Sequence, residues 1–179
     1  MLETILIILG SLALLILVIV VVVSLQPNDY RVARSETINA PQSEVFPHVN
    51  DLRLMNEWSP WLEADPQVKQ TYDGAAQGAG AIYTWNGNNK VGEGRMTIIE
   101  SQPNDKIHIK LDFMRPFKST ADVEFTFKAQ GDQTVVTWAM NGRKIFITKL
   151  FGLIMSMDKM IGGNFEKGLA KLKKIVETR

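Results

Sequence analysis

The N-terminal end of the chain is an uninterrupted apolar run. Residues 4–25 form 22 consecutive positions without a charged side chain, mostly Ile, Leu and Val. As an α-helix, such a run would be about 33 Å long, enough to cross the roughly 30 Å hydrocarbon core of a bilayer. A lone strand would leave its backbone groups unpaired in lipid. The run therefore predicts a transmembrane anchor over residues 1–26.

A cleaved signal peptide is the alternative interpretation of this run. No Lys or Arg precedes it, and no small-x-small cleavage motif follows, since the exit reads Ser24-Leu25-Gln26-Pro27. These features favour a retained anchor. Arg31 and Arg34 follow the run closely, whereas Glu3 is the only charged side chain before it. The positive-inside rule then places the C-terminal part in the cytoplasm.

The remaining residues, 27–179, have the size of one domain with its own core. The whole chain has a formal net charge of +1. This argues against a nucleic-acid partner, because proteins that bind nucleic acid carry an excess of basic residues. It contains no Cys and only two His, His48 and His108. A disulfide framework, a thiolate nucleophile and a multi-histidine metal site are thereby excluded. We expect no metal and no cofactor.

The first part of this domain predicts one strand and two helices. Residues 30–38 alternate and are rich in β-branched side chains, as in a strand. A helix over residues 40–50 should follow, with Asn39 as its N-cap and a kink at Pro47. A second short helix is predicted over residues 52–58.

A series of strands comes next, separated by turn signals such as Asn86-Gly87. The predicted strands are residues 69–72, 81–85, 90–101, 106–113, 119–128 and 134–140. Short turns between neighbouring strands indicate an antiparallel meander. Apolar and polar residues alternate along the later strands, so the sheet should have one apolar face and be covered on that side.

The C-terminal segment supplies the cover. Between Ile147 and Val176 apolar residues recur every three or four positions, which predicts an amphipathic helix. Gly162-Gly163 lies in the middle of this segment. The pair indicates either a helix break or close packing against the sheet, or else a narrowing that leaves room for a ligand.

This order of elements, with several local motifs, resembles a known superfamily. The motifs are Ile38-Asn39-Ala40-Pro41 with Val45-Phe46, the run from Asn50-Asp51 to Trp58-Ser59-Pro60-Trp61, Gly78-Ala79-Gly80, Trp85, Val91-Gly92-Glu93-Gly94-Arg95-Met96, Asp158-Lys159-Met160 and Phe165-Glu166-Lys167-Gly168-Leu169. Over about residues 30–177 the chain is similar to the START-like superfamily, specifically its membrane-anchored bacterial polyketide cyclase/dehydrase-like SRPBCC members. The resemblance implies an α+β helix-grip fold, in which a curved antiparallel sheet of about seven strands surrounds a long C-terminal helix. One transmembrane helix would precede it.

The resemblance also implies a location and a range of functions. Residues 1–26 would anchor the START-like ligand-binding domain, residues 27–179, in a bacterial inner membrane. The superfamily includes lipid carriers, hormone receptors, cyclases, oxygenase subunits and chaperone activators, so the fold alone does not select one activity.

Aromatic and Met side chains are the candidate ligand-binding residues. Trp58 and Trp61 bracket Ser59-Pro60 and would line the mouth of a cavity or plug the end of the core. The other candidates should face the gap between sheet and helix: Tyr83, Trp85, Met96, Phe113, Phe125, Trp138, Met155, Met157 and Met160. The same side chains would fill a solid core or line a cavity, and Met adapts to ligands of varied shape.

No catalytic residue is assigned. The acids Asp51, Glu57, Glu63, Asp65 and Asp158 lack the spacing that would give a general acid or base its partner, so we expect solvated surface charges. Both histidines are expected at the surface. Tyr83 is the one titratable side chain expected to point inward.

We therefore expect a membrane-anchored domain that binds an apolar small molecule or lipid between sheet and helix. The first alternative is an enzyme of the polyketide cyclase or aromatase type, which would need polar groups in the cavity. The second is a protein-interaction module related to the chaperone activators, which would present an exposed apolar patch outside the cavity.

Overall fold

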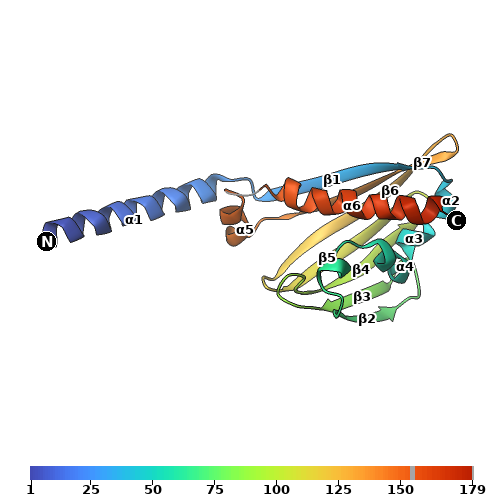
Figure 1. The fold of residues 1–179 in the computed structure, drawn as a ribbon, viewed down its shortest axis with the longest axis horizontal. Helices are drawn as coiled ribbons and strands as arrows, with labels where there is room; N and C mark the ends of the chain where they lie inside the picture. The colour runs from blue at the N-terminus through green and yellow to red at the C-terminus, as the bar shows by residue number, and fades with distance from the viewer. Residues whose placement is uncertain (154–155, 179) are drawn as a thin grey trace.

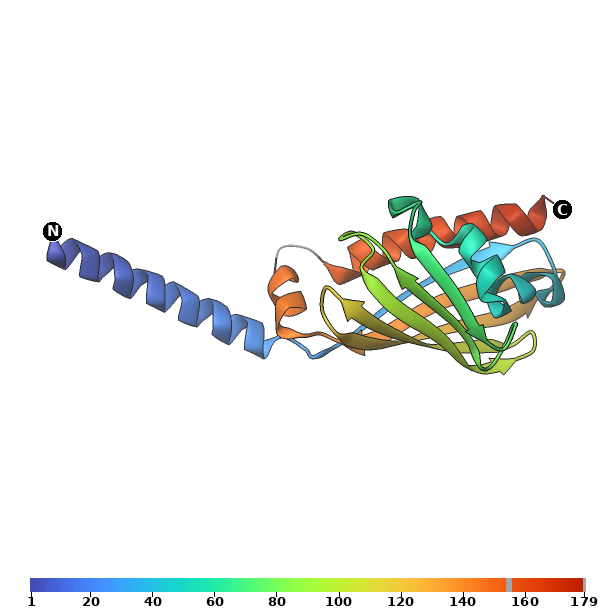
Figure 2. The same ribbon diagram turned by 90° about the horizontal axis from the view of Figure 1, so that it is seen from below.

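A computed structural model describes residues 1–153 and 156–178 of the chain. Helix α1 (Leu2–Leu25) projects away from the remainder of the molecule, as Figures 1 and 2 show. Within the described residues it is the one helix long and apolar enough to cross a membrane. The elements that follow are β1 (Asp29–Ile38), α2 (Gln42–Val45), α3 (Pro47–Asn50), α4 (Leu52–Trp58), the 3-10 turn η1 (Leu62–Ala64), β2 (Lys69–Gly74), β3 (Ala81–Asn86), β4 (Glu93–Gln102), β5 (Lys106–Arg115), β6 (Ser119–Gln130), β7 (Gln133–Arg143), α5 (Phe146–Phe151) and α6 (Met157–Glu177).

The strands form one antiparallel sheet of seven, in the order β1-β7-β6-β5-β4-β3-β2. Strands β2 to β7 form a meander, and β1 is the edge strand that pairs with β7. Two register shifts in β4, at Glu93/Gly94 and Ile98/Glu100, mark β-bulges, which bend a strand and increase its twist. The curved sheet with α6 beside its concave face confirms the predicted α+β helix-grip fold (Figure 1).

The predicted alternation correctly identified the buried face of the central strands. Ile107 and Ile109 of β5 are fully buried, as are Phe125 of β6 and Val136 of β7. Successive strand side chains point to opposite faces, so this periodicity leaves the intervening polar residues on the convex side.

The helices after β1 differ from the prediction in two details. The expected helix over residues 40–50 is divided into α2 and α3, because Pro47 has no backbone N–H to donate to the preceding turn and instead begins α3. The predicted N-cap at Asn39 is wrong. Its backbone N–H donates to Glu177 Oε1 at 2.7 Å, and its side chain accepts from Gln133. Helix α4 has the predicted bounds.

The C-terminal segment is two helices, α5 and α6, where the periodicity predicted one over residues 147–176. Helix α5 ends at Phe151, before Gly152, and contacts α1, so its apolar side chains do not belong to the stripe that covers the sheet. Helix α6 packs along β1 and α4 and buries Phe165, Leu169 and Leu172 against the core. The apolar period alone did not distinguish the two environments.

Gly162 continues α6 without a break and lies against Arg34 of β1. A Cβ at Gly162 would be 2.1 Å from Arg34 Nη2. The guanidinium donates to both carboxylate oxygens of Asp158, each at 2.9 Å, and to Glu166 Oε1 at 2.6 Å. The hydrogen bonds from Arg34 hold the pKa of Asp158 below its usual range. Of the two interpretations of the Gly pair, this contact supports close packing against the sheet.

The two neighbouring glycines should respond differently to the same added methyl group. Nothing lies within 4 Å of a Cβ at Gly163. We expect Gly163→Ala to raise the free energy of unfolding by about 0.5–1 kcal/mol, because Ala loses less backbone entropy in a helix. Gly162→Ala should gain less or lose stability, because its methyl displaces Arg34. Urea unfolding of the full chain in detergent, followed by circular dichroism, measures both. Equal stabilisation would show that the Arg34 contact contributes nothing.

Candidate functional site

A cavity of about 280 Å³ lies between the concave face of the sheet and helices α4 and α6. The sheet contributes side chains at alternating positions, among them Tyr83 and Trp85 of β3 and Leu111 and Phe113 of β5. From the helices come Met55, Asn56, Ile161 and Phe165. The wall is dominated by aromatic, Met and aliphatic side chains, which is the usual lining of a small-molecule site.

The mouth of the cavity is marked by the lining residues that are also exposed. These are Trp61 at the start of η1, Lys90 in the β3–β4 connection, and Arg115 with Pro116 at the end of β5. Arg115 Nε donates to Glu93 Oε2 at 2.8 Å, and its Nη2 donates to Asn86 Oδ1 at 2.7 Å. Two cationic side chains therefore stand at an entrance that leads into an apolar interior.

One polar cluster interrupts the apolar wall. Asn56, which is buried, donates through Nδ2 to the hydroxyl of Tyr72 at 2.7 Å, and that hydroxyl donates to Gln70 Oε1 at 2.9 Å. Tyr83 lies beside it, with its ring centroid 5.2 Å from that of Tyr72. Burial raises the pKa of Tyr83 to about 12. The phenol is therefore protonated at neutral pH and can donate a hydrogen bond, but it is a poor proton acceptor.

The structure places the predicted ligand-binding residues in four situations. Six line the cavity: Trp61, Tyr83, Trp85, Met96, Phe113 and Trp138. Trp58 and Phe125 are fully buried in the core and do not line this cavity. Met160 is 52% exposed and does not line it either. Met155 and the side chain of Met157 lie outside what the structure describes.

The two tryptophans of the Trp58-Ser59-Pro60-Trp61 motif thus have opposite surroundings. Trp58 ends α4, packs edge-on against Phe125 and Trp138, and donates from Nε1 to His48 O at 2.9 Å. Trp61 is 42% exposed at the mouth. Trp58 therefore fills the end of the core, whereas Trp61 lies at the mouth of the cavity.

Several lining residues were not predicted as site residues. Ile161 and Phe165 lie on the predicted apolar stripe of α6, so a sequence signal existed for these two. Met55 and Asn56 lie in the correctly predicted helix α4, for which no inward face was predicted. Lys90 and Pro116 belong to connections between strands, where periodicity carries no information about which way a side chain points.

Two polar residues expected at the surface are buried. His48 in α3 is 3% exposed, because this short helix buries its two middle residues, His48 and Val49. Asp65 is 8% exposed and accepts hydrogen bonds from the backbone N–H groups of Gln67 and Asn88. Both positions are structural corrections to the sequence-based expectation. Among the described residues, no group of three or more His, Asp or Glu side chains is placed to hold a metal ion.

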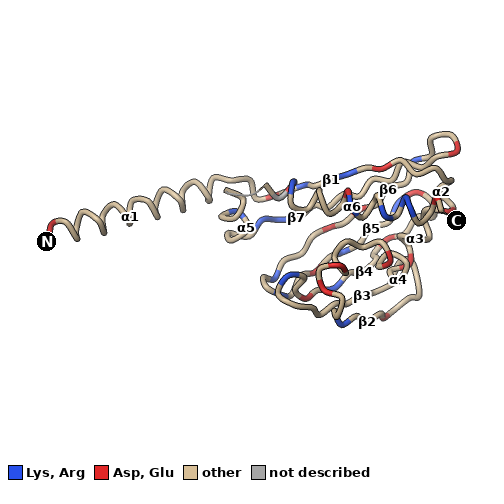
Figure 3. The backbone as a smooth tube through the Cα atoms, in the orientation of Figure 1, with Lys and Arg blue, Asp and Glu red and all other residues tan. Residues whose placement is uncertain are grey.

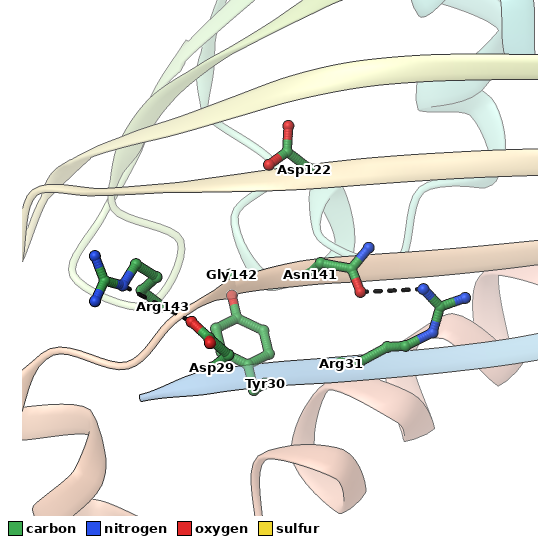
Figure 4. Close-up of a pocket in the computed structure, with 7 residues that line it drawn as sticks. All are labelled: Asp29, Tyr30, Arg31, Asp122, Asn141, Gly142 and Arg143. Atoms are coloured by element: carbon green, nitrogen blue, oxygen red, sulfur yellow. Dashed lines mark hydrogen bonds and ion pairs between the residues drawn. The ribbon is translucent and has the colours of Figure 1, made fainter. Parts of the chain in front are cut away.

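A second hollow of about 500 Å³ lies at the start of β1 and the end of β7, and it is open to solvent. Figure 4 shows its lining, with Arg31 donating to Asn141 Oδ1 at 3.2 Å and Arg143 within 3.7 Å of Asp29. The Tyr30 ring lies over Gly142, where a Cβ would be 2.7 Å from the hydroxyl oxygen. This hollow is shallow and lined mostly by charged and polar residues, unlike the deeper, mainly apolar cavity between sheet and α6.

Comparisons with known proteins agree with this geometry. The family described as polyketide cyclase / dehydrase and lipid transport matches residues 29–177. An uncharacterized protein from Rhizobium leguminosarum has a TM-score of 0.59 at 12% identity, covering 84% of this chain and 96% of that one. The protein TTHA0849 from Thermus thermophilus has a TM-score of 0.60 at 18% identity, covering 83% of this chain and 98% of that one.

A third protein of similar structure belongs to a biosynthetic pathway. The di-domain ARO/CYC StfQ of the steffimycin biosynthetic pathway has a TM-score of 0.61 at 12% identity, covering 85% of this chain and 52% of that one. The comparison with curated proteins finds no match. At these identities the solved structures establish the fold alone, whereas the family match spans nearly the whole domain. The chain belongs to the polyketide cyclase / dehydrase and lipid transport family.

Proposed function

We propose that this chain is a membrane-anchored binding protein that holds an apolar small molecule or the apolar part of a lipid between its sheet and α6. The observation that carries the proposal is the cavity of about 280 Å³ with a wall of aromatic, aliphatic and Met side chains. Burial of apolar ligand surface would supply about 25 cal/mol per Å² before the cost of ordering the ligand. The family description, which includes lipid transport, supports the same ligand class.

The cavity favours an elongated ligand whose polar end stays outside. Its volume is at the small end for ligand sites, and the mouth carries Lys90 and Arg115. A lipid whose acyl chain enters the cavity would place an anionic head beside these cations. A compact apolar molecule would fit wholly inside.

Membrane anchoring is the second part of the proposal. Helix α1 has no charged side chain after Glu3, and its apolar side chains are exposed along nearly its whole length. Such a surface is stable in lipid and unstable in water. With Arg31 and Arg34 just beyond it, we assign the domain to the cytoplasmic side of a bacterial inner membrane.

Native mass spectrometry of the full chain, released from detergent micelles, tests ligand binding. We expect one tightly held apolar molecule or lipid per chain, identified by fragmentation of the complex. Lipids that surround α1 would also be detected, so the control is Val123→Phe, which fills the cavity from β6 and leaves α1 unchanged. A ligand retained equally by both chains would be bound outside the cavity and would contradict the proposal.

An enzyme of the cyclase or aromatase type is the second candidate, favoured by the polar cluster at Asn56, Tyr72 and Tyr83. One of the proteins with a similar fold, StfQ, is a di-domain ARO/CYC. Binding of an apolar ligand needs no hydroxyl at Tyr83, so we expect Tyr83→Phe to change ligand occupancy by less than about twofold. Native mass spectrometry measures the occupancy. Loss of a reaction on a polyketide-like substrate, with binding retained, would instead support the enzyme.

A further inference from the structure

The short linker between α1 and the domain is held by α5. Lys149 of α5 is only 7% exposed, and its Nζ donates to Gln26 O at 3.0 Å and to Asn28 Oδ1 at 2.7 Å. The backbone N–H of Lys144 donates to Asn28 O at 2.6 Å. The linker therefore has defined partners on the domain, and α1 leaves the domain in a set direction.

Helix α5 also packs beside the C-terminal end of α1. The two helices are in contact, and Val23, near the last turn of α1, is fully buried although its neighbours in α1 are exposed. If α1 spans a bilayer, its last turn lies at the boundary between acyl chains and headgroups. Helix α5 must then lie at the same depth (Figures 1 and 2).

The strand register places the mouth of the cavity at this same end of the sheet. Asp29, the first residue of β1, pairs with Arg143 at the end of β7, from which the chain continues to α5. Phe113 pairs with Ser119, so the β5–β6 turn, residues 116–118, lies at this end too. The β3–β4 connection joins it, because Glu93 pairs with Arg115. Of the mouth residues, Lys90 and Pro116 are in these connections and Arg115 is the last residue of β5.

Exposed apolar side chains gather on this end. After α1, the described part of the chain has seven large hydrophobic residues that are exposed, and four of them are in the β5–β6 turn or the α5 segment. Phe117 of the β5–β6 turn is 49% exposed, and Phe146, Phe151 and Leu153 of the α5 segment are 53%, 61% and 45% exposed. Water would penalise such a cluster, whereas the interfacial layer of a bilayer favours aromatic side chains.

The same end carries an excess of positive charge, visible as blue segments near α5 and at the ends of β1 and β7 in Figure 3. Its exposed cations are Arg31, Lys90, Arg115, Lys118, Arg143 and Lys159. Asp29, Glu93 and Asp158 pair with Arg143, Arg115 and Arg34. Asp122, which is level with Arg31 in the strand register, is also an acid at this end and contacts His108. Lys90, Lys118 and Lys159 make no ion pair within the described residues. Their charge complements an anionic leaflet, which attracts basic side chains near the membrane surface.

We propose that α5 and the β5–β6 turn form a second membrane contact, which seats the mouth of the cavity on the headgroup layer of an anionic bilayer. Phe117, Phe146, Phe151 and Leu153 enter the interface, and the basic side chains around them contact the lipid heads. A ligand would then pass between bilayer and cavity without crossing water. This inference rests on the proposed function, because α1 must first hold the chain in the membrane.

The absence of Cys allows each position to be probed singly. The experiment uses the full chain in nanodiscs that contain phosphatidylglycerol, with one introduced Cys carrying an environment-sensitive fluorophore. Spin-labelled lipids provide the quencher, placed either near the headgroup or deep in the acyl chains. The test positions are Phe151→Cys and Phe117→Cys. The matched control is Asp132→Cys in the β6–β7 turn at the opposite end of the sheet, and Ser11→Cys in α1 reports insertion of the anchor.

We expect the probes at positions 151 and 117 to lose most of their fluorescence to the headgroup-proximal quencher, and the probe at 132 to lose almost none. The probe at 11 should respond to the deep quencher. If position 11 responds while 151 and 117 behave like 132, the second contact is overturned and the anchor remains. If 151 alone is quenched, the mouth is not seated and the proposal is also overturned. If position 11 does not respond, the anchor itself, and with it the proposed function, is contradicted.

Discussion

Replacing Trp58 by Ala should lower the free energy of unfolding by about 3–5 kcal/mol, a large part of the stability of a domain this size. Trp58 is fully buried, and its ring packs edge-on against Phe125 at 6.1 Å and Trp138 at 5.5 Å between centroids. Its indole N–H also satisfies the backbone carbonyl of His48. The substitution leaves a void where α4 meets the sheet and removes the partner of that carbonyl.

Trp61→Ala is the matched control, because it removes the same side chain three residues away. Trp61 is 42% exposed at the cavity mouth, so we expect a loss of less than about 1 kcal/mol. Urea unfolding of both variants in detergent, monitored by tryptophan fluorescence and circular dichroism, gives the comparison. Similar losses at the two positions would mean that Trp58 does not occupy the core as described.

Val123→Phe should weaken ligand binding at least about tenfold, equivalent to about 1.4 kcal/mol of binding free energy, with little change in stability. Val123 lies at the middle of β6, is 3% exposed, and borders the cavity. The added ring atoms would occupy space that a ligand needs. Where a void receives the larger side chain, the usual strain of overpacking is absent.

Ile109→Phe distinguishes a filled cavity from a crowded core. Ile109 pairs directly with Val123 across β5 and β6, and it is fully buried without lining the cavity. We expect this variant to lose about 1–3 kcal/mol of stability, since its surroundings are already packed. Ligand occupancy from native mass spectrometry and unfolding free energy are measured for both. Equal destabilisation by the two substitutions would show that no usable cavity exists next to Val123.

Local sequence patterns predicted most of the sheet. Alternation along β5 and β6 placed Ile107, Ile109 and Phe125 on the buried face. Successive side chains of a strand point to opposite faces, so the parity of a position, odd or even, determines its face. Turn signals such as Asn86-Gly87 marked the strand ends to within a few residues. These features depend on residues next to one another in the chain, so they can be read without knowing the rest of the fold.

The site was predicted less completely than the sheet. Parity put Tyr83, Trp85, Met96, Phe113 and Trp138 on the correct face of the sheet, and all five border the cavity. It also put Phe125 there, yet Phe125 contacts Trp58 and lies in the solid part of the core. Parity identifies a face but not the distance to the opposite helix. That distance depends on how α4 and α6 pack.

By itself, the sequence determined the apolar run of α1, the antiparallel meander and the amphipathic stripe of α6, because each follows from periodicity and burial over a short stretch of chain. Only the tertiary structure decided that Trp58 is core while Trp61 is at the mouth, and that α5 leaves the stripe to hold Gln26 and Asn28 through Lys149. It also decided that a cavity remains between sheet and helix. These outcomes depend on side-chain volumes and on contacts between residues far apart in the chain, and no local pattern encodes them.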